Sequence, residues 1–166
     1  MNTCLLKKLT LLALAAGTML TAHAALKVGD TMPDLTGFSL EGKLPDALKG
    51  KVVIVDFWAS WCGPCKDSFP VMNELQKKYS DKGVVFIAVN EDEEKSDMQD
   101  FLKANAATFT VVRDAKQKLV GVAGIQTMPS SFVFDETGKL RFTHNGFHGA
   151  QTRKEYEQQI ESLLKK

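Results

Sequence analysis

The chain has 166 residues, 44% of them hydrophobic and 25% charged, and its formal net charge is +1 at pH 7. A chain of this length without internal repeats or low-complexity stretches indicates a single domain of ordinary size. The near-neutral charge argues against a nucleic-acid partner, because nucleic acid is bound by strongly basic surfaces.

The N-terminus, residues 1–24, has the layout of a secretory signal peptide. Lys7 and Lys8 precede an apolar core at residues 9–20 that is too short to span a bilayer comfortably. The tripeptide Ala22-His23-Ala24 then fits the small-x-small cleavage pattern. Export to a bacterial periplasm is therefore predicted, and an uncleaved N-terminal anchor is the alternative.

Cleavage before Ala25 would leave residues 25–166 as one mature domain with a net charge of −1 and no transmembrane segment. No cysteine directly follows the cleavage point, which argues against a lipid anchor. In an oxidising compartment such as the periplasm, a dithiol stays reduced only if another component re-reduces it. An unidentified membrane or periplasmic thiol reductant is therefore an expected partner.

The mature chain begins with short extended pieces and turn signals over residues 25–50, which predict a hairpin-like lead-in. Residues 52–58 are apolar at nearly every position, as expected for a strand that is covered on both faces. The pattern that follows is helical as far as about Tyr79, with apolar residues spaced three to four apart. This part of the chain therefore predicts a buried strand that leads directly into a long helix.

The middle of the chain predicts a second buried strand and an α/β insert. The strand covers residues 84–90 and is followed by an acidic run at residues 91–94. We interpret this run as the solvated beginning of a helix at residues 96–105, with a ligand cage as the alternative. A short strand at residues 109–112 and a short helix at residues 117–123 complete the insert.

The C-terminal part predicts a hairpin and a final helix. Strands at residues 131–134 and 140–145 are separated by a short turn, so they should run antiparallel. The capping-box pattern Thr152-x-x-Glu155 predicts the beginning of the last helix. The order of all these elements indicates an α/β fold with a central mixed sheet and helices on both faces.

Cys62-Gly63-Pro64-Cys65 lies at the junction between the first buried strand and the long helix. A thiolate at a helix N-terminus faces unpaired N–H groups and the positive end of the helix dipole, which lowers its pKa. Cys62 is therefore the expected nucleophile. Pro64 suits the first helical turn, and Gly63 leaves room for a partner disulfide. A Cys-x-x-Cys pair in this position indicates a redox centre.

A metal site is the alternative for this pair. A closed zinc site needs four ligands, usually two such pairs or additional histidines. Cys4 is the only other cysteine, and it lies in the predicted signal peptide. His144 and His148 are four residues apart, but the glycines around them argue against a helical ligand pair, so we interpret both as surface or packing side chains. We expect no metal and no cofactor beyond the redox-active cysteines.

Two segments resemble those of a known fold. The stretch Asp56-Phe57-Trp58-Ala59-Ser60-Trp61-Cys62-Gly63-Pro64-Cys65-Lys66 is close to the thioredoxin signature. The segment Gly124-Ile125-Gln126-Thr127-Met128-Pro129 resembles the one that carries the cis-proline of that fold. The resemblance implies a cis Met128–Pro129 bond beside Cys62, where this segment would pair with an extended client chain.

Within the thioredoxin superfamily, the chain is similar to the exported TlpA/ResA-type thiol–disulfide oxidoreductases. The shared features are the predicted signal, the lead-in Gly29-Asp30-x-x-Pro33-Asp34, the insert after Asn90, and Phe132-Val133-Phe134-Asp135-x-x-Gly138. This resemblance implies a thioredoxin-like three-layer domain with an N-terminal extension and an α/β insert.

The chain departs from that group near the cysteines. Ser68 stands three residues after the second cysteine, where many members carry a glutamate. Asp56 instead matches the buried aspartate of thioredoxins, and Ala88 stands where thioredoxin has a nearby lysine. The resemblance implies that Asp56 accepts the proton of Cys65, and a carboxylate in an apolar strand should have the raised pKa that this task needs. A purely structural Asp56 is the alternative.

These features predict a periplasmic thiol–disulfide oxidoreductase that reduces the disulfides of client proteins, with cytochrome c maturation as one option. Cys62 would attack the client, Cys65 would resolve the mixed disulfide, and Trp61 would lie beside the site. A disulfide oxidase or isomerase, a non-enzymatic metal or haem carrier, and a peroxidase are the alternatives. The Gly-Pro dipeptide between the cysteines resembles that of reducing thioredoxins and favours the reductase.

Overall fold

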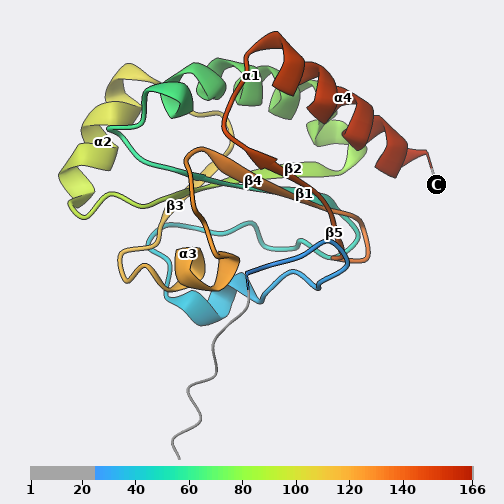
Figure 1. The fold of residues 1–166 in the computed structure, drawn as a ribbon, viewed down its shortest axis with the longest axis horizontal. Helices are drawn as coiled ribbons and strands as arrows, with labels where there is room; N and C mark the ends of the chain where they lie inside the picture. The colour runs from blue at the N-terminus through green and yellow to red at the C-terminus, as the bar shows by residue number, and fades with distance from the viewer. Residues whose placement is uncertain (1–24, 166) are drawn as a thin grey trace, which may run out of the picture.

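The computed structural model describes residues 25–165, so the predicted signal peptide lies outside the described residues. Five strands form one mixed sheet in the order β3-β2-β1-β4-β5 (Figure 1). Strand β1 is parallel to β2, and β2 is parallel to β3, whereas β4 is antiparallel to both β1 and β5. The predicted mixed sheet and C-terminal hairpin are therefore confirmed. The strands are β1 Val52–Trp58, β2 Val84–Asn90, β3 Thr110–Arg113, β4 Ser130–Phe134 and β5 Leu140–Asn145.

Helices cover both faces of this sheet. Figure 1 shows α1, α2 and α4 on one face, and α3 together with the N-terminal segment on the other. The three-layer thioredoxin-like arrangement is therefore confirmed. The α-helices are α1 Gly63–Tyr79, α2 Lys95–Ala104, α3 Lys118–Ala123 and α4 Ala150–Leu164, and the short 3₁₀ helices are η1 Leu35–Phe38 and η2 Ser80–Lys82.

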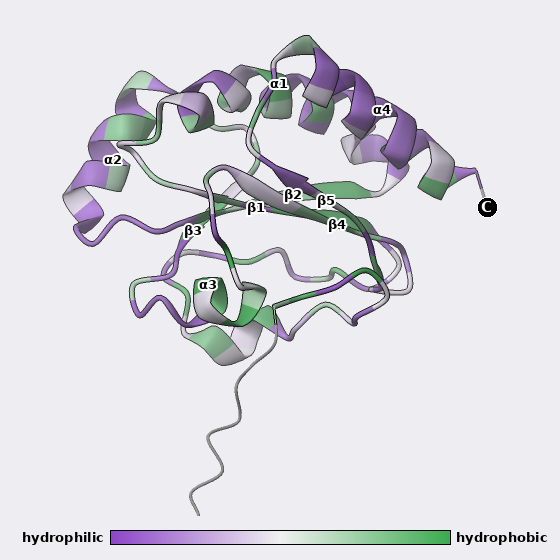
Figure 2. Ribbon diagram, in the orientation of Figure 1, coloured by the Kyte–Doolittle hydropathy of each residue, from purple (hydrophilic) through white to green (hydrophobic). Residues whose placement is uncertain are grey.

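The central strand β1 is buried along its whole length and supplies both halves of the core. Its even-numbered residues Ile54 and Trp58 belong to the apolar cluster that also contains Cys62 and Cys65. The odd-numbered residues between them pack into the cluster on the other face. Because side chains alternate along a strand, Asp56 faces the same layer as the two cysteines. Figure 2 shows hydrophobic colour along the central strands and mostly hydrophilic colour along α4.

The N-terminal lead-in is not a hairpin, which corrects the sequence-based expectation. It forms one 3₁₀ turn, η1, whose N-cap Asp34 accepts a hydrogen bond from the Thr36 N–H. Its extended pieces form isolated bridges to distant partners, Thr31 with Lys139 and Glu41 with Arg113. The partners of the extended pieces therefore lie in other parts of the chain.

The capping-box prediction for the last helix is also wrong. Helix α4 begins earlier, at Ala150, after the N-cap residue Gly149, whose φ is 59°. The Thr152 hydroxyl accepts a hydrogen bond from the His148 N–H, and Glu155 accepts one from the Gln151 side chain. Glycine adopts a positive φ readily, so the chain enters the helix one turn before the Thr-x-x-Glu pattern.

None of the helices between residues 25 and 165 has both the length and the apolar character required of a membrane span.

Candidate active site

The two cysteines form a disulfide at the N-terminus of α1. Cys62 is the N-cap residue, and its Sγ accepts a hydrogen bond of 3.2 Å from the Cys65 N–H. Pro64 lies in the first turn, as predicted. A Cβ placed on Gly63 would meet no atom within 4 Å, so this position is open toward an approaching partner. The local sequence therefore builds a helix N-terminus directed at the first sulfur.

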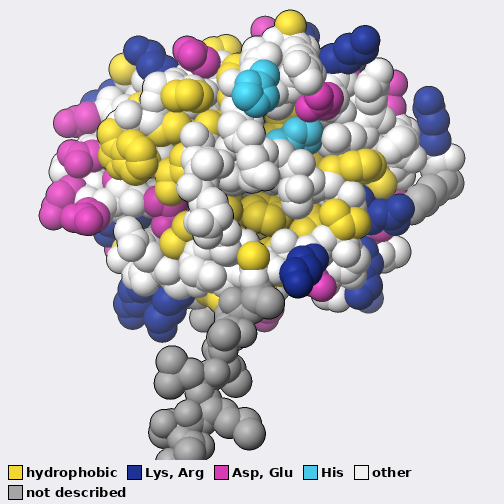
Figure 3. All heavy atoms as spheres, viewed as in Figure 1, with side chains coloured by type: hydrophobic (Ala, Val, Ile, Leu, Met, Phe, Trp, Pro, Cys, Tyr) yellow, Lys and Arg dark blue, Asp and Glu magenta, His cyan; other side chains and the backbone are white. Residues whose placement is uncertain are grey.

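The two sulfur-bearing residues differ in accessibility. Cys62 keeps 6% of its surface exposed, whereas Cys65 is fully buried. Trp61, directly before the pair, is 73% exposed, which is unusual for a large apolar side chain. Figure 3 shows hydrophobic side chains at the surface near the loop between β1 and α1, with acidic side chains beside them. Cys62 therefore retains a small exposed surface, whereas Cys65 has none.

Asp56 is buried in β1, between Ala88 of β2 and Ser131 of β4. The Ser131 hydroxyl donates a hydrogen bond of 2.5 Å to Asp56 Oδ1, while Oδ2 is buried and has no hydrogen-bond partner. Burial raises the pKa of Asp56 to about 7, and the hydrogen bond from Ser131 partly opposes this rise. A buried carboxyl with one oxygen free of hydrogen bonds and a pKa near 7 has the properties of a proton acceptor.

The position of Ala88 explains why Asp56 lacks a cationic neighbour. Ala88 is the cross-strand partner of Asp56 on β2, and its methyl side chain carries no charge. Ser68 in α1 is buried, and its hydroxyl donates a hydrogen bond to the Cys65 carbonyl. Neither Ala88 nor Ser68 therefore adds a charged group beside Asp56.

The acidic run after β2 is not fully solvated, which corrects the sequence-based interpretation. Glu91 and Asp92 are buried, whereas Glu93 and Glu94 are exposed. Asp92 accepts hydrogen bonds from both the backbone N–H and the hydroxyl of Ser60, so it anchors the loop that leads to the cysteines. The run follows a parallel strand next to β1, and this position could have indicated its closeness to the redox loop.

Glu91 is the most unusual member of that run. Its two carboxyl oxygens are buried without hydrogen-bond partners. Burial, followed by the nearby charges of Asp114 and Asp92, raises the pKa of Glu91 to about 9. It lines a surface hollow together with Trp61, Asp92, Glu93, Asp97 and Gln117. Glu91 is therefore a neutral acid at pH 7.

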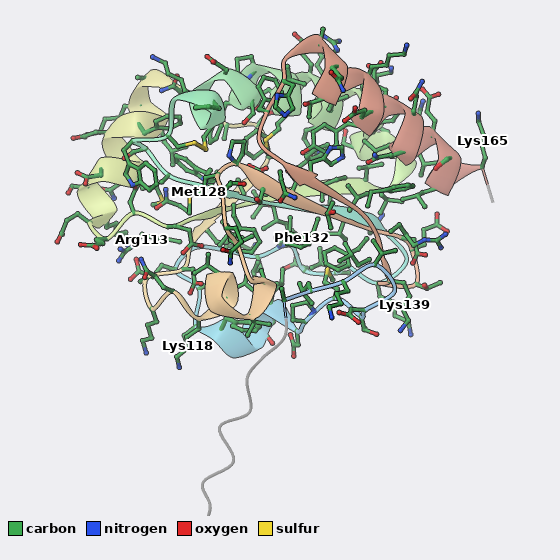
Figure 4. The ribbon with its side chains drawn as sticks, viewed as in Figure 1. Arg113, Lys118, Met128, Phe132, Lys139 and Lys165 are labelled. Carbon is green, nitrogen blue, oxygen red and sulfur yellow. A yellow bond between two sulfur atoms is a disulfide. The ribbon has the colours of Figure 1, made fainter. Side chains whose placement is uncertain are left out.

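The Met128–Pro129 peptide bond is cis, as predicted. Met128, labelled in Figure 4, packs against the apolar cluster that contains both cysteines. The carbonyl of Pro129 accepts a hydrogen bond of 2.7 Å from the Gly146 N–H. This turn directly precedes β4 and so connects the cysteine layer with the strand that carries Ser131.

His144 is a packing residue, in agreement with the sequence-based interpretation. It is buried, and its ring centroid lies 4.5 Å from that of Tyr156. Among residues 25–165, no group of three or more histidine, cysteine, aspartate or glutamate side chains is arranged to hold a metal ion.

The redox pair, its helix and the surrounding fold match a known family. The Redoxin family profile matches residues 27–160, which is most of the chain. The chain belongs to the Redoxin family. In this Redoxin protein, the cysteine pair lies at the N-terminus of the helix that follows the central strand.

Individual relatives give the activity. The chain is 38% identical over 144 residues to the thiol-disulfide oxidoreductase ResA of Bacillus anthracis, covering 85% of this chain and 79% of that protein. It is 36% identical over 145 residues to the thioredoxin-like protein YneN of Bacillus subtilis, covering 84% and 82%. A structure described as a thiol:disulfide interchange protein DsbE from Chlorobium tepidum matches with a TM-score of 0.77 and 42% identity, covering 84% and 99%.

This Redoxin protein is accordingly a thiol–disulfide oxidoreductase. Enzymes of this family need no cofactor, because the cysteine sulfurs themselves are oxidised and reduced.

Proposed function

We propose that this protein is an exported, periplasmic reductase of protein disulfides. The observation on which the proposal rests is the unequal pair: Cys62 caps the helix N-terminus and retains a small exposed surface, whereas Cys65 is completely buried in the layer that Asp56 faces. The Gly63-Pro64 dipeptide, which resembles that of reducing thioredoxins, favours reduction over oxidation. The sequence pattern of residues 1–24 supports export.

The reaction starts with the reduced pair. The Cys62 thiolate attacks one sulfur of the client disulfide, forms a mixed disulfide and releases the first client thiolate. The helix N-terminus stabilises this thiolate, because its free N–H groups and dipole favour negative charge. Trp61 and the Met128–Pro129 segment would contact the client on either side of Cys62.

The second step releases the client. The Cys65 thiol gives its proton to Asp56, and the resulting thiolate attacks Cys62 Sγ. The mixed disulfide breaks, the second client sulfur leaves as a thiolate, and the Cys62–Cys65 disulfide remains. Two electrons have passed from the enzyme to the client, and a membrane or periplasmic thiol reductant returns the enzyme to the dithiol form.

The redox potential of the Cys62–Cys65 pair tests the direction of electron flow. We expect a value near that of thioredoxin, about −270 mV, because the protein is proposed as a reductant. A value near that of strong oxidants, about −120 mV, would instead support a disulfide oxidase or isomerase.

Cysteine variants test the assigned roles. We expect Cys62→Ser to abolish disulfide reduction, because the attacking sulfur is missing, and Cys65→Ser to accumulate mixed disulfides, because the resolving step is lost. Preferential alkylation of Cys65 over Cys62 in the reduced protein would reverse the assignment.

Oxidised apocytochrome c is one client that we include in the proposal, because its Cys-x-x-Cys-His haem site must be reduced before haem attachment. The assay compares an oxidised Cys-x-x-Cys-His peptide with a peptide of the same charge that has a disulfide of different spacing. Faster reduction of the first peptide supports a role in cytochrome c maturation, and equal rates support a general reductase.

A further inference from the structure

Three buried side chains from three elements form one hydrogen-bonded chain behind the cysteines. Asp56 is on β1, Ser131 on β4 and Tyr156 on α4, and all three are buried. The Ser131 hydroxyl lies 2.5 Å from Asp56 Oδ1 and 2.5 Å from the Tyr156 hydroxyl. The three residues are therefore connected through the single oxygen of Ser131.

The direction of these hydrogen bonds follows from the number of available protons. A serine hydroxyl has one proton to donate, and an ionised carboxylate can only accept. When Asp56 is ionised, Ser131 must donate to Asp56, and Tyr156 must then donate to Ser131. Burial, followed by the charges of Asp56 and Glu155, raises the pKa of Tyr156, so the phenol keeps the proton that it donates.

We propose that Ser131 and Tyr156 are positioning residues for the proton acceptor Asp56. They occupy Oδ1 and thereby leave Oδ2, which has no partner, as the oxygen that receives the Cys65 proton. They also stabilise the ionised carboxylate with hydroxyl dipoles in place of a cation. This inference rests on the proposed proton transfer from Cys65 to Asp56.

The surroundings contain few other groups that could perform this task. Among the described residues, β2 presents the uncharged Ala88 opposite Asp56, and α1 presents Cys65 to the same layer. The buried His144 of β5 packs against the phenol ring of Tyr156, with the two ring planes tilted by 38°. His144 Nδ1 lies 3.5 Å from a carboxylate oxygen of Glu155, which is partly exposed. These two groups act on Tyr156, whereas Ser131 makes the direct contact with Asp56.

The consequence is a predictable change in the pH at which Asp56 titrates. A hydrogen bond to a charged group contributes about 1.5–3 kcal/mol, and a pKa change of one unit corresponds to about 1.4 kcal/mol. Removing the Ser131 hydroxyl should therefore shift the Asp56 titration upward by about one to two pH units. Removing only the Tyr156 hydroxyl should shift it in the same direction by less, because Tyr156 acts through Ser131.

The experiment measures two quantities in the same variants of the mature, reduced protein. One is the pH dependence of mixed-disulfide resolution in single-turnover reactions with a disulfide peptide. The other is the titration of the Asp56 carboxyl carbon by NMR, which reports the carboxylate directly. The variants are Ser131→Ala and Tyr156→Phe. Ser131→Thr retains a hydroxyl and should restore the titration.

Tyr79→Phe is the matched control for Tyr156→Phe. Tyr79 is also buried, and its hydroxyl donates a hydrogen bond to Glu161 rather than to the Asp56 group. We expect this variant to leave both titrations unchanged. We also expect Tyr156→Phe to have no further effect on resolution in an Asp56→Asn background, because its effect passes through the carboxylate.

Two results separate failure of this inference from failure of the proposed function. If Asp56 titrates at the same pH in Ser131→Ala and in the wild-type protein, the positioning role of Ser131 and Tyr156 is overturned. If the NMR titration shifts as expected but the rate of resolution does not depend on Asp56, the hydroxyl chain stands and the proton transfer is rejected. If Ser131→Ala does not fold, Ser131→Thr is compared with Ser131→Cys. The threonine hydroxyl is a strong hydrogen-bond donor and the cysteine thiol a weak one, and the two side chains are of similar size.

Discussion

Two buried carboxyl groups lie near the redox loop, and their surroundings give them different properties. Burial is the largest cause of the raised pKa in both, to about 7 for Asp56 and about 9 for Glu91. Asp56 receives a hydrogen bond from Ser131, which lowers its pKa, whereas the neighbours of Glu91 are the acidic Asp114 and Asp92, which raise it. Burial makes each group weakly acidic, and the neighbours decide whether it can exchange a proton near neutral pH.

This comparison assigns different tasks to the two groups. With a pKa of about 7, Asp56 changes protonation around neutral pH, so it can accept the Cys65 proton and later release it. With a pKa of about 9, Glu91 remains protonated around neutral pH, so it is a neutral part of the hollow beside Trp61. Substitution of each acid by its amide therefore provides a direct test, because the amide mimics the protonated form.

The largest expected effect is on the resolving step. Asp56→Asn should slow the release of client from the mixed disulfide about 100-fold, since a positioned acid or base contributes typically 10²–10⁴-fold. The initial attack by Cys62 should be almost unchanged. Rapid-quench kinetics with a disulfide peptide measure both steps separately, and Glu91→Gln is the matched control that should leave both rates unaltered. Equal slowing in the two variants would break the distinction between the carboxyl groups.

The second effect is on stability. The pKa of Glu91 is about 9 in the folded protein, above its ordinary value of 4.5, so the unfolded chain releases this proton at lower pH than the folded protein does. The stability that protonated Glu91 contributes at low pH is therefore lost as the pH rises from about 4.5 toward about 9. Glu91→Gln should remove this loss and raise the free energy of unfolding on the order of 2 kcal/mol at pH 8. Urea denaturation at pH 5 and pH 8 checks the sign, because the gain should be larger at pH 8.

Asp56→Asn should also raise the free energy of unfolding, by less than Glu91→Gln does. The folded-state pKa of Asp56 is raised from 3.8 to about 7, so its contribution to stability falls between these two pH values. The variant should therefore gain stability relative to the unchanged protein between pH 4 and pH 7, and this difference should level off above pH 7. Lower stability of Asp56→Asn across this range would instead indicate a structural role for the carboxylate.

The smallest expected effect concerns a third buried carboxylate, Asp135, whose pKa is lowered where those of Asp56 and Glu91 are raised. Burial would raise the pKa of Asp135, but hydrogen bonds from Thr137, Lys139 and Arg141 outweigh it and lower the pKa to about 2. Its stabilising contribution is present above about pH 4 and is lost as pH falls toward about 2. Asp135→Asn should cost about 1 kcal/mol at pH 7 and flatten the acid limb of the stability profile. Acid titration monitored by circular dichroism measures this difference.

The sequence by itself determined the parts of this protein that depend on neighbouring residues. The apolar run at residues 52–58 became the buried central strand, and the Cys62–Cys65 motif after it became a helix N-terminus. The cis bond before Pro129 and the burial of Asp56 also agree with the predictions. The strand and the helix N-terminus follow from local pattern, because an apolar run and a Cys-Gly-Pro-Cys turn carry their own conformational preferences. The cis bond followed from the resemblance of residues 124–129 to the thioredoxin fold.

Only the tertiary structure decided which distant groups meet. Ser131 and Tyr156 are 25 residues apart, and Ser131 and Asp56 are 75 apart, so no local pattern could pair them. The extended pieces of the lead-in likewise bridge to residues far along the chain rather than to each other. The burial of Glu91 and Asp92 was also not predictable, because an acidic run in the sequence is typical of a solvated segment and only the fold encloses these two side chains. The reason is physical: burial and hydrogen-bond partners are properties of the packed sheet and helices, and these properties set the pKa of each carboxyl group.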